Sequence, residues 1–258
     1  MFDIIRTRFQ QKYRTLSWPR GPAPELPHRY AGRPIMDGDC LENCTACIDA
    51  CPTGAISLSN NQNPALPAEL SMDLGKCLFC RKCETVCTHG VITFSRQSRM
   101  AATQRDALII KKNSPGFTEP LTKKAPAIFK KSLKLRQVCA GGCNACEADT
   151  NVLGTIGWDL ARFGIDFVAS PRHADGLLVT GPVTRNMETA LKKTYDALPS
   201  PKIVIATGAC AISGGPYAGH AQQHNGVDAI LPVDLYIPGC PPHPFTILEA
   251  LLCYLGKI

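Results

Sequence analysis

The residues of this chain that could do chemistry are its 14 cysteines. Cys77, Cys80, Cys83 and Cys87, in CLFCRKCETVC, have the C-x2-C-x2-C-x3-C spacing with which thiolates bind 4Fe–4S clusters. Three closely spaced thiolates can wrap one corner of a cubane, while the fourth points away toward a second cluster. The motif therefore predicts two clusters and a second set of ligands.

A second copy of the arrangement lies upstream, in CLENCTACIDACP at residues 40–52. The first cluster is predicted to use Cys40, Cys44, Cys47 and Cys87, and the second to use Cys77, Cys80, Cys83 and Cys51. Two details depart from the pattern: the first gap is x3, and Thr88 follows the second motif where proline is usual. Zinc also uses paired CxxC motifs, but eight cysteines in this interleaved order favour cubanes.

Five further cysteines form a second constellation: Cys139, Cys143, Cys146, Cys210 and Cys240. Cys210 and Cys240 each follow an apolar, strand-like run. Loops that leave the carboxyl ends of parallel strands build sites, so ligands are expected at these positions.

The elements that position these residues divide the chain into two modules. Residues 37–98 hold the two Cys repeats, each followed by a short apolar stretch, which predicts a small α+β domain. From residue 137, strand-like runs alternate with helical patterns, which predicts an α/β domain with a mostly parallel, flavodoxin-like sheet. The runs are 165–170, 176–181, 202–208 and 229–239, and the helical patterns are 144–163, 184–197 and 243–256.

Two basic segments flank the first module. In residues 1–36, Ile5, Phe9, Tyr13 and Leu16 recur at helical spacing among arginines and lysines. This helix lies on a membrane or a membrane subunit in one interpretation, and packs on its own domain in the other. Residues 99–136 are lysine-rich without a clear period and are predicted to be a linker.

Composition sets further limits. The formal charge of +7 falls to about +1 if each of three cluster sites carries about −2, so it does not indicate nucleic-acid binding. No apolar run approaches the roughly 18 residues of a transmembrane helix, and residues 1–15 lack the apolar core of a secretory signal. We therefore expect a reducing, cytoplasmic compartment, in which dense Cys motifs bind metal.

Four segments carry a specific resemblance, which covers nearly all of residues 137–258. They are GGCNACE (141–147), SPRHADGLLVTGPVTRNM (170–187), TGACAISGGPY (207–217) and VDLYIPGCPPHP (233–244). They resemble the small subunit of group 4, energy-converting NiFe hydrogenases and the homologous 20 kDa-type subunit of respiratory complex I. The N-terminal part, with GRP (32–34) and LGKCLFCRKCE (74–84), is similar to the two-cluster ferredoxin subunit of formate hydrogenlyase. The chain thus looks like a fusion of two subunits.

The resemblance implies ligands for a third cluster: Cys143 and Cys146 as the first pair, then Cys210 and Cys240. Gly214 and Gly215, which follow Cys210, are expected to let backbone amides approach the sulfides, or else to form a plain turn. By the same resemblance Arg172 and His173 lie near a partner subunit or are simple surface residues, and Glu147 relays protons or caps a helix. Cys139 is expected to be a spare thiol and Cys253 a small buried hydrophobe.

The predicted function is an electron relay through three 4Fe–4S clusters, without an active site in this chain. The resemblance implies a NiFe hydrogenase-like or complex I-like large subunit and membrane subunits as partners, with a further electron-donor subunit. It places the chain on the inner face of the cell membrane. The alternative is the same relay in a complex that lacks a NiFe centre and reduces quinone or ferredoxin. A third hypothesis, a cluster-based sensor or nucleic-acid-binding module, has only the basic linker in its favour.

Overall fold

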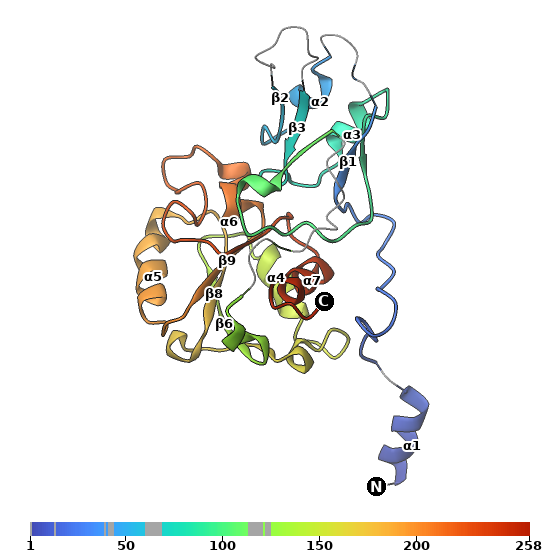
Figure 1. Cartoon of the computed structure of the whole chain (residues 1–258), viewed down its shortest axis with the longest axis vertical. Coiled ribbons are helices and arrows are strands. Elements are labelled where there is room, and N and C mark those ends of the chain that lie inside the picture. The colour runs from blue at the N-terminus through green and yellow to red at the C-terminus, as the bar shows by residue number, and fades with distance from the viewer. Residues whose placement is uncertain are drawn as a thin grey trace.

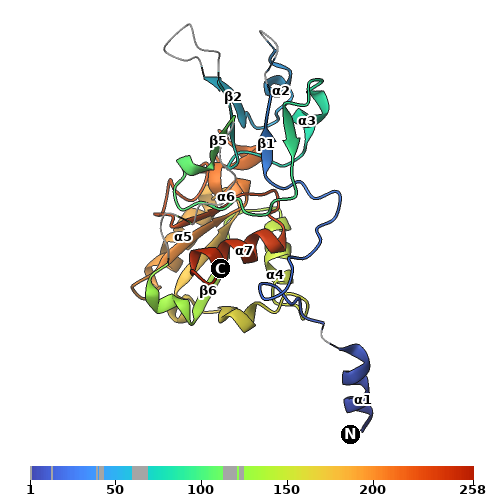
Figure 2. The same ribbon diagram turned by 45° about the vertical axis from the view of Figure 1, so that its right-hand side comes forward.

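A computed structural model describes residues 2–12, 14–38, 40, 44–59, 69–112, 121 and 125–258. Tyr13, which the predicted N-terminal helix includes, lies outside these residues. Two modules are visible, with the Cys repeats above and a larger α/β module below (Figures 1 and 2). Within the described residues no helix has the length and apolar character that crossing a bilayer requires.

The upper module, here the ferredoxin-like module, is α+β as predicted. Its three-stranded antiparallel sheet has the order β2-β3-β5, and a two-stranded sheet pairs β1 with β4. The elements are β1 (Pro34–Met36), α2 (Ala46–Asp49), β2 (Ile56–Ser59), β3 (Glu69–Asp73), α3 (Lys82–Val86), β4 (Ile92–Phe94) and β5 (Ile109–Lys111).

The lower module is built on a five-stranded, all-parallel sheet of order β10-β9-β8-β6-β7. Numbered within the module, this is the flavodoxin-like order 2-1-3-4-5, so the predicted fold class is confirmed. The strands are β6 (Leu133–Cys139), β7 (Ile165–Phe167), β8 (Gly176–Thr180), β9 (Ile203–Thr207) and β10 (Leu235–Ile237). The helices are α4 (Ala145–Val152), α5 (Arg185–Asp196), α6 (Ala209–Ser213) and α7 (Pro244–Tyr254).

The central strands are buried on both faces, which explains their continuous apolar runs. Leu178 and Ile205 face a core formed with α7, whereas Leu177 and Val204 face a core with α5 and α6. This second core continues without a break into the ferredoxin-like module, where it includes Met72. The two halves therefore share packing and do not form two isolated cores.

Two sequence expectations about segments were wrong. The segment 99–136, predicted to be a linker, contains β5 and the first residues of β6, because Leu133 and Leu135 alternate with basic residues whose side chains leave the core. Ala102 also exchanges backbone hydrogen bonds with Tyr236. The pattern at 144–163 is not one helix, since α4 ends at Val152 and a 3-10 turn covers Leu160–Phe163. The domain boundaries themselves remain predictions.

The N-terminal segment divides into a projecting helix and a strap. Helix α1 (Phe2–Gln11) has no buried residue and extends away from the body (Figure 1). Residues 14–33, here the N-terminal strap, then run along the α/β module. In the strap Trp18 packs edge-to-face on Phe245 with ring centroids 5.0 Å apart, and Tyr30 hydrogen-bonds Thr246 at 2.9 Å.

Candidate metal centres

The first group of thiols surrounds Cys47 and is here called group A: Cys40, Cys44, Cys47 and Cys87. Cys47 lies on the short helix α2 and is 7% exposed. Its pKa is raised by burial and then by the charges of Cys40, Cys87 and Cys44. The four predicted ligands of the first cluster thus lie near one another. Residues 41–43, which form the x3 gap of the first motif, lie outside the described residues.

Group B is Cys51, Cys77, Cys80 and Cys83, the predicted ligands of the second cluster. All four line one cavity of about 310 Å³, part of it open to solvent. Burial is the largest cause that raises the pKa of Cys77 to about 12 and that of Cys83 to about 11, and charges of neighbouring thiols add to it. The donors that line this cavity are soft thiols, which suit an iron–sulfur cluster.

The backbone of the CLFCRKC loop is shaped around these thiols. Phe79 and Arg81 have φ values of 54° and 61°, which side chains other than glycine rarely adopt. With this geometry the N–H of Phe79 donates to Cys77 Sγ at 3.3 Å, and the N–H of Ala55 donates to Cys51 Sγ at 3.2 Å. Such N–H···S hydrogen bonds stabilise thiolates and tune the potential of a bound cluster.

Group C is Cys143, Cys146, Cys210 and Cys240, gathered at the carboxyl ends of three parallel strands. β6 leads to the loop of Cys143 and Cys146, β9 leads to Cys210 on α6, and β10 leads to Cys240. Burial raises the pKa of Cys210 to about 11, with further contributions from Cys240 and Cys143. The pKa of Cys146 is raised by burial, by Glu147 and by the three other thiols. Asn144, between the first two ligands, has φ 70°.

Two glycines leave space beside the thiols of group C. A Cβ on Gly215 would lie 2.9 Å from Cys210 Sγ, and one on Gly208 would lie 2.6 Å from Cys146 Sγ. Both have positive φ, at 55° and 91°. Gly214, predicted together with Gly215, instead meets the backbone of Ala218 and Asn225. Gly208 was missed in the sequence, although its place directly after a buried strand was a signal that could have indicated it.

Cys139 and Glu147 form a small polar group beside group C. The Thr180 hydroxyl donates to Glu147 Oε1 at 2.5 Å, and the Cys139 thiol also hydrogen-bonds this carboxylate. Burial raises the pKa of Glu147, but these hydrogen bonds outweigh it and the net shift is downward. Cys139 therefore has a partner other than the four thiols of group C.

The remaining residues that the sequence singled out lie at the periphery. Arg172 and His173 are exposed in the 3-10 turn Pro171–His173. His243 caps α7 by accepting the N–H of Phe245 at 3.1 Å. Cys253 is partly buried on α7.

Groups B and C are neighbours across the junction of the two modules. Burial and the charge of Cys143 raise the pKa of Cys240, and the charge of Cys80 raises it further. Among the residues that the structure describes, no three Cys, His, Asp or Glu side chains converge on a position for a single metal ion. The donor sets, four thiols in each group, fit 4Fe–4S clusters.

Sequence comparisons agree with this two-module architecture. Residues 39–91 match the 4Fe-4S dicluster domain, and residues 143–254 match the family described as NADH ubiquinone oxidoreductase, 20 Kd subunit. A probable membrane-bound hydrogenase subunit of Pyrococcus furiosus is 44% identical over 121 residues, which are 47% of this chain and 72% of that protein. The chain belongs to the 20 Kd subunit family. The predicted joining of two family modules in one polypeptide is thereby confirmed.

Other members of the family are similarly close. An NADH-quinone oxidoreductase subunit of Bacteroides thetaiotaomicron is 50% identical over 116 residues, which are 45% of this chain. The chain spans only 59% of the length of that relative. A chain in the structure of the archaeal membrane-bound sulfane sulfur reductase is 36% identical, with a TM-score of 0.44; the match covers 50% of this chain and 71% of that one.

Proposed function

We propose that this protein is an electron-transfer subunit that holds three 4Fe–4S clusters, one in each of groups A, B and C. A 4Fe–4S cluster takes up and releases one electron without forming or breaking a covalent bond to substrate. The observation that carries the proposal is the proximity of the predicted ligands. Cys47 lies near the other thiols of group A, the four thiols of group B line one cavity, and Cys146 lies near the other thiols of group C.

The order of the groups supports a linear route. Cys51 follows α2 of the first repeat but lines the cavity of group B, and Cys87 of the second repeat lies beside Cys47 in group A. The two repeats thus exchange one thiol each and hold groups A and B together. Cys80 of group B lies close enough to Cys240 of group C for its charge to raise the pKa of Cys240, so groups B and C are also neighbours. Electrons would pass between A and C by way of B.

We propose that group C faces the active site of a large subunit, so that this chain has no active site of its own. The similarity to a probable membrane-bound hydrogenase subunit favours a NiFe hydrogenase-like complex, as in formate hydrogenlyase. The similarity to NADH-quinone oxidoreductase subunits favours the second candidate, a complex I-like relay to quinone or ferredoxin without a NiFe centre. Two CxxC pairs in the partner large subunit would support the first; a partner without them would rule it out.

Helix α1 is the proposed attachment to the membrane part of the complex, on the inner face of the cell membrane. Phe2 and Phe9 are 88% and 79% exposed, and Arg6 and Arg8 lie on the same helix. Apolar and basic residues on one projecting helix suit an anionic lipid surface or a membrane subunit at that surface.

Iron and acid-labile sulfide analysis of anaerobically purified protein tests the proposal. Three 4Fe–4S clusters require about twelve iron and twelve sulfide per chain. About eight of each would remove one group from the relay, and zinc without sulfide would refute the function. Cys240→Ser should lower the iron content by about four and leave the clusters of groups A and B bound.

A further inference from the structure

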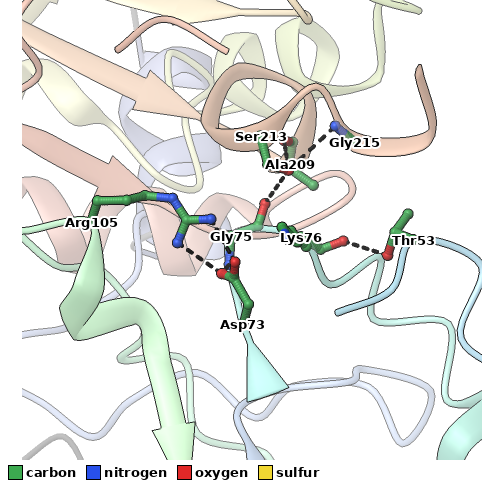
Figure 3. Close-up of polar contacts among 8 residues, drawn as sticks. All are labelled: Thr53, Asp73, Gly75, Lys76, Arg105, Ala209, Ser213 and Gly215. Atoms are coloured by element: carbon green, nitrogen blue, oxygen red, sulfur yellow. Dashed lines mark hydrogen bonds and ion pairs between the residues drawn. The ribbon is translucent and has the colours of Figure 1, made fainter. Parts of the chain in front are cut away.

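The two modules are in contact at Gly75, two residues before Cys77 of group B. Its carbonyl accepts a hydrogen bond from the Ser213 hydroxyl at 2.9 Å (Figure 3). Ser213 ends α6, the helix that carries Cys210 of group C. One hydrogen bond therefore links the loop that enters group B to the helix that enters group C.

Gly75 permits this contact because it has no side chain. A Cβ at this position would lie 2.6 Å from Ile212 Cγ2 and 2.9 Å from Arg105 Cζ. Real Cβ atoms do not approach other heavy atoms so closely, and both neighbours are packed against the junction. Any larger residue would push the loop of group B away from α6.

Charged and polar groups hold the same loop from its other sides. Arg105 donates two hydrogen bonds to the Asp73 carboxylate, at 2.8 and 2.6 Å, and Asp73 Oδ1 accepts the N–H of Gly75 at 2.8 Å (Figure 3). The Thr53 hydroxyl donates to the carbonyl of Lys76 at 2.8 Å. A bidentate arginine–carboxylate pair fixes both distance and orientation.

We infer that Gly75, Ser213 and Arg105 are positioning residues that set the separation between groups B and C. The inference rests on the proposed function, since it concerns how electrons pass between these groups. Electron tunnelling between two centres falls steeply with their separation. A loop that shifts away from α6 would slow transfer while both sets of thiols stay intact.

The test is electron paramagnetic resonance of the fully reduced full-length protein, in which neighbouring clusters split each other's signals. The splitting that disappears in Cys240→Ser is assigned to the pair of groups B and C. Ser213→Ala and Gly75→Ala are expected to lose this splitting with unchanged iron and sulfide content. Ser213→Thr, which keeps the hydroxyl, should retain it.

Ser57→Ala is the matched control, because it removes a serine hydrogen bond to Ser71 inside the ferredoxin-like module. It should retain the splitting. If Gly75→Ala loses iron, its loss of splitting no longer reports the separation of the groups, and Ser213→Ala alone tests the inference. Wild-type splitting in Ser213→Ala, the same loss in Ser57→Ala, or loaded wild-type protein without any splitting between the two groups would overturn the inference. Wild-type protein without iron and sulfide would instead refute the proposed function.

Discussion

Removing the Arg105 guanidinium should weaken the junction of the two modules by a measurable amount. The side chains of Arg105 and Asp73 are only 24% and 15% exposed, and two charge-assisted hydrogen bonds join them. Hydrogen bonds to charged groups contribute about 1.5–3 kcal/mol each. The two share one guanidinium and some solvent remains, so we expect Arg105→Ala to lower the free energy of unfolding by about 2–3 kcal/mol.

For a chain of this size each kcal/mol shifts Tm by about 2–4 °C, so the expected decrease is about 4–12 °C. The assay is thermal unfolding of anaerobic, cluster-loaded protein at one fixed scan rate, because unfolding of such proteins is often irreversible. Lys111→Ala is the control: it breaks a pair with Glu69 whose side chains are 52% and 35% exposed. Exposed pairs contribute at most about 1 kcal/mol. Equal decreases in the two variants would refute the reasoning.

The pH dependence gives a second check on Arg105. Burial raises the pKa of Asp228, and the positive charge of Arg105 lowers it in part. Without Arg105 this pKa should rise further above its unfolded value of about 3.9. A carboxyl with a raised folded-state pKa favours folding while it is protonated, and this contribution is lost as pH rises through the raised pKa. The destabilisation by Arg105→Ala should therefore grow with pH, and a loss that shrinks with pH would contradict this account.

Three further predictions follow from the described residues. Gly208→Ala should prevent group C from binding its cluster, because the new Cβ would lie 2.6 Å from Cys146 Sγ. The expected measurement is a loss of about four iron per chain. Phe9→Glu should weaken cosedimentation with vesicles of anionic lipid. Gln11→Glu changes the charge equally on the same helix and should weaken it less. Equal effects of the two variants would mean that charge alone, and not the apolar ring of Phe9, accounts for binding to the vesicles. Trp18→Ala removes a ring that is 9% exposed and should lower stability by about 3 kcal/mol in urea unfolding, while clusters stay bound until the transition.

Much of the site could be predicted because its signals are local. Cysteine spacing can be read directly from the sequence. A loop that follows a buried parallel strand lies at the carboxyl edge of the sheet, whatever position the strand has in the sheet. Cysteine spacing therefore predicted the ligands of groups A and B, whereas the choice of four among five cysteines for group C needed the family resemblance. The place of Gly214 and Gly215 shortly after Cys210 led to the prediction that they leave room beside a cluster.

What could not be predicted depends on distant parts of the chain. β5 has three residues, too few for a periodic pattern, and it pairs with β3, so that Ile110 lies opposite Met72. The contact between Ser213 and Gly75 joins residues 138 positions apart, and no local pattern of either segment reveals it. α1 ends at Gln11, and Lys12 directly after it has φ 53°, a left-handed conformation that does not continue a helix. The backbone N–H of Leu16 instead donates to the carbonyl of Gly157 in the α/β module.

The N-terminal strap has a consequence for the order in which this protein can be completed. Its partner Thr246 lies 216 residues after Tyr30, so a growing chain makes the strap long before the surface that receives it. The Cys repeats can emerge from the ribosome and fold before the strap has made its contact with α7. Its contacts with α7 can form only after α7 has been synthesised, and so this part of its docking is a late event that depends on both halves of the polypeptide being present.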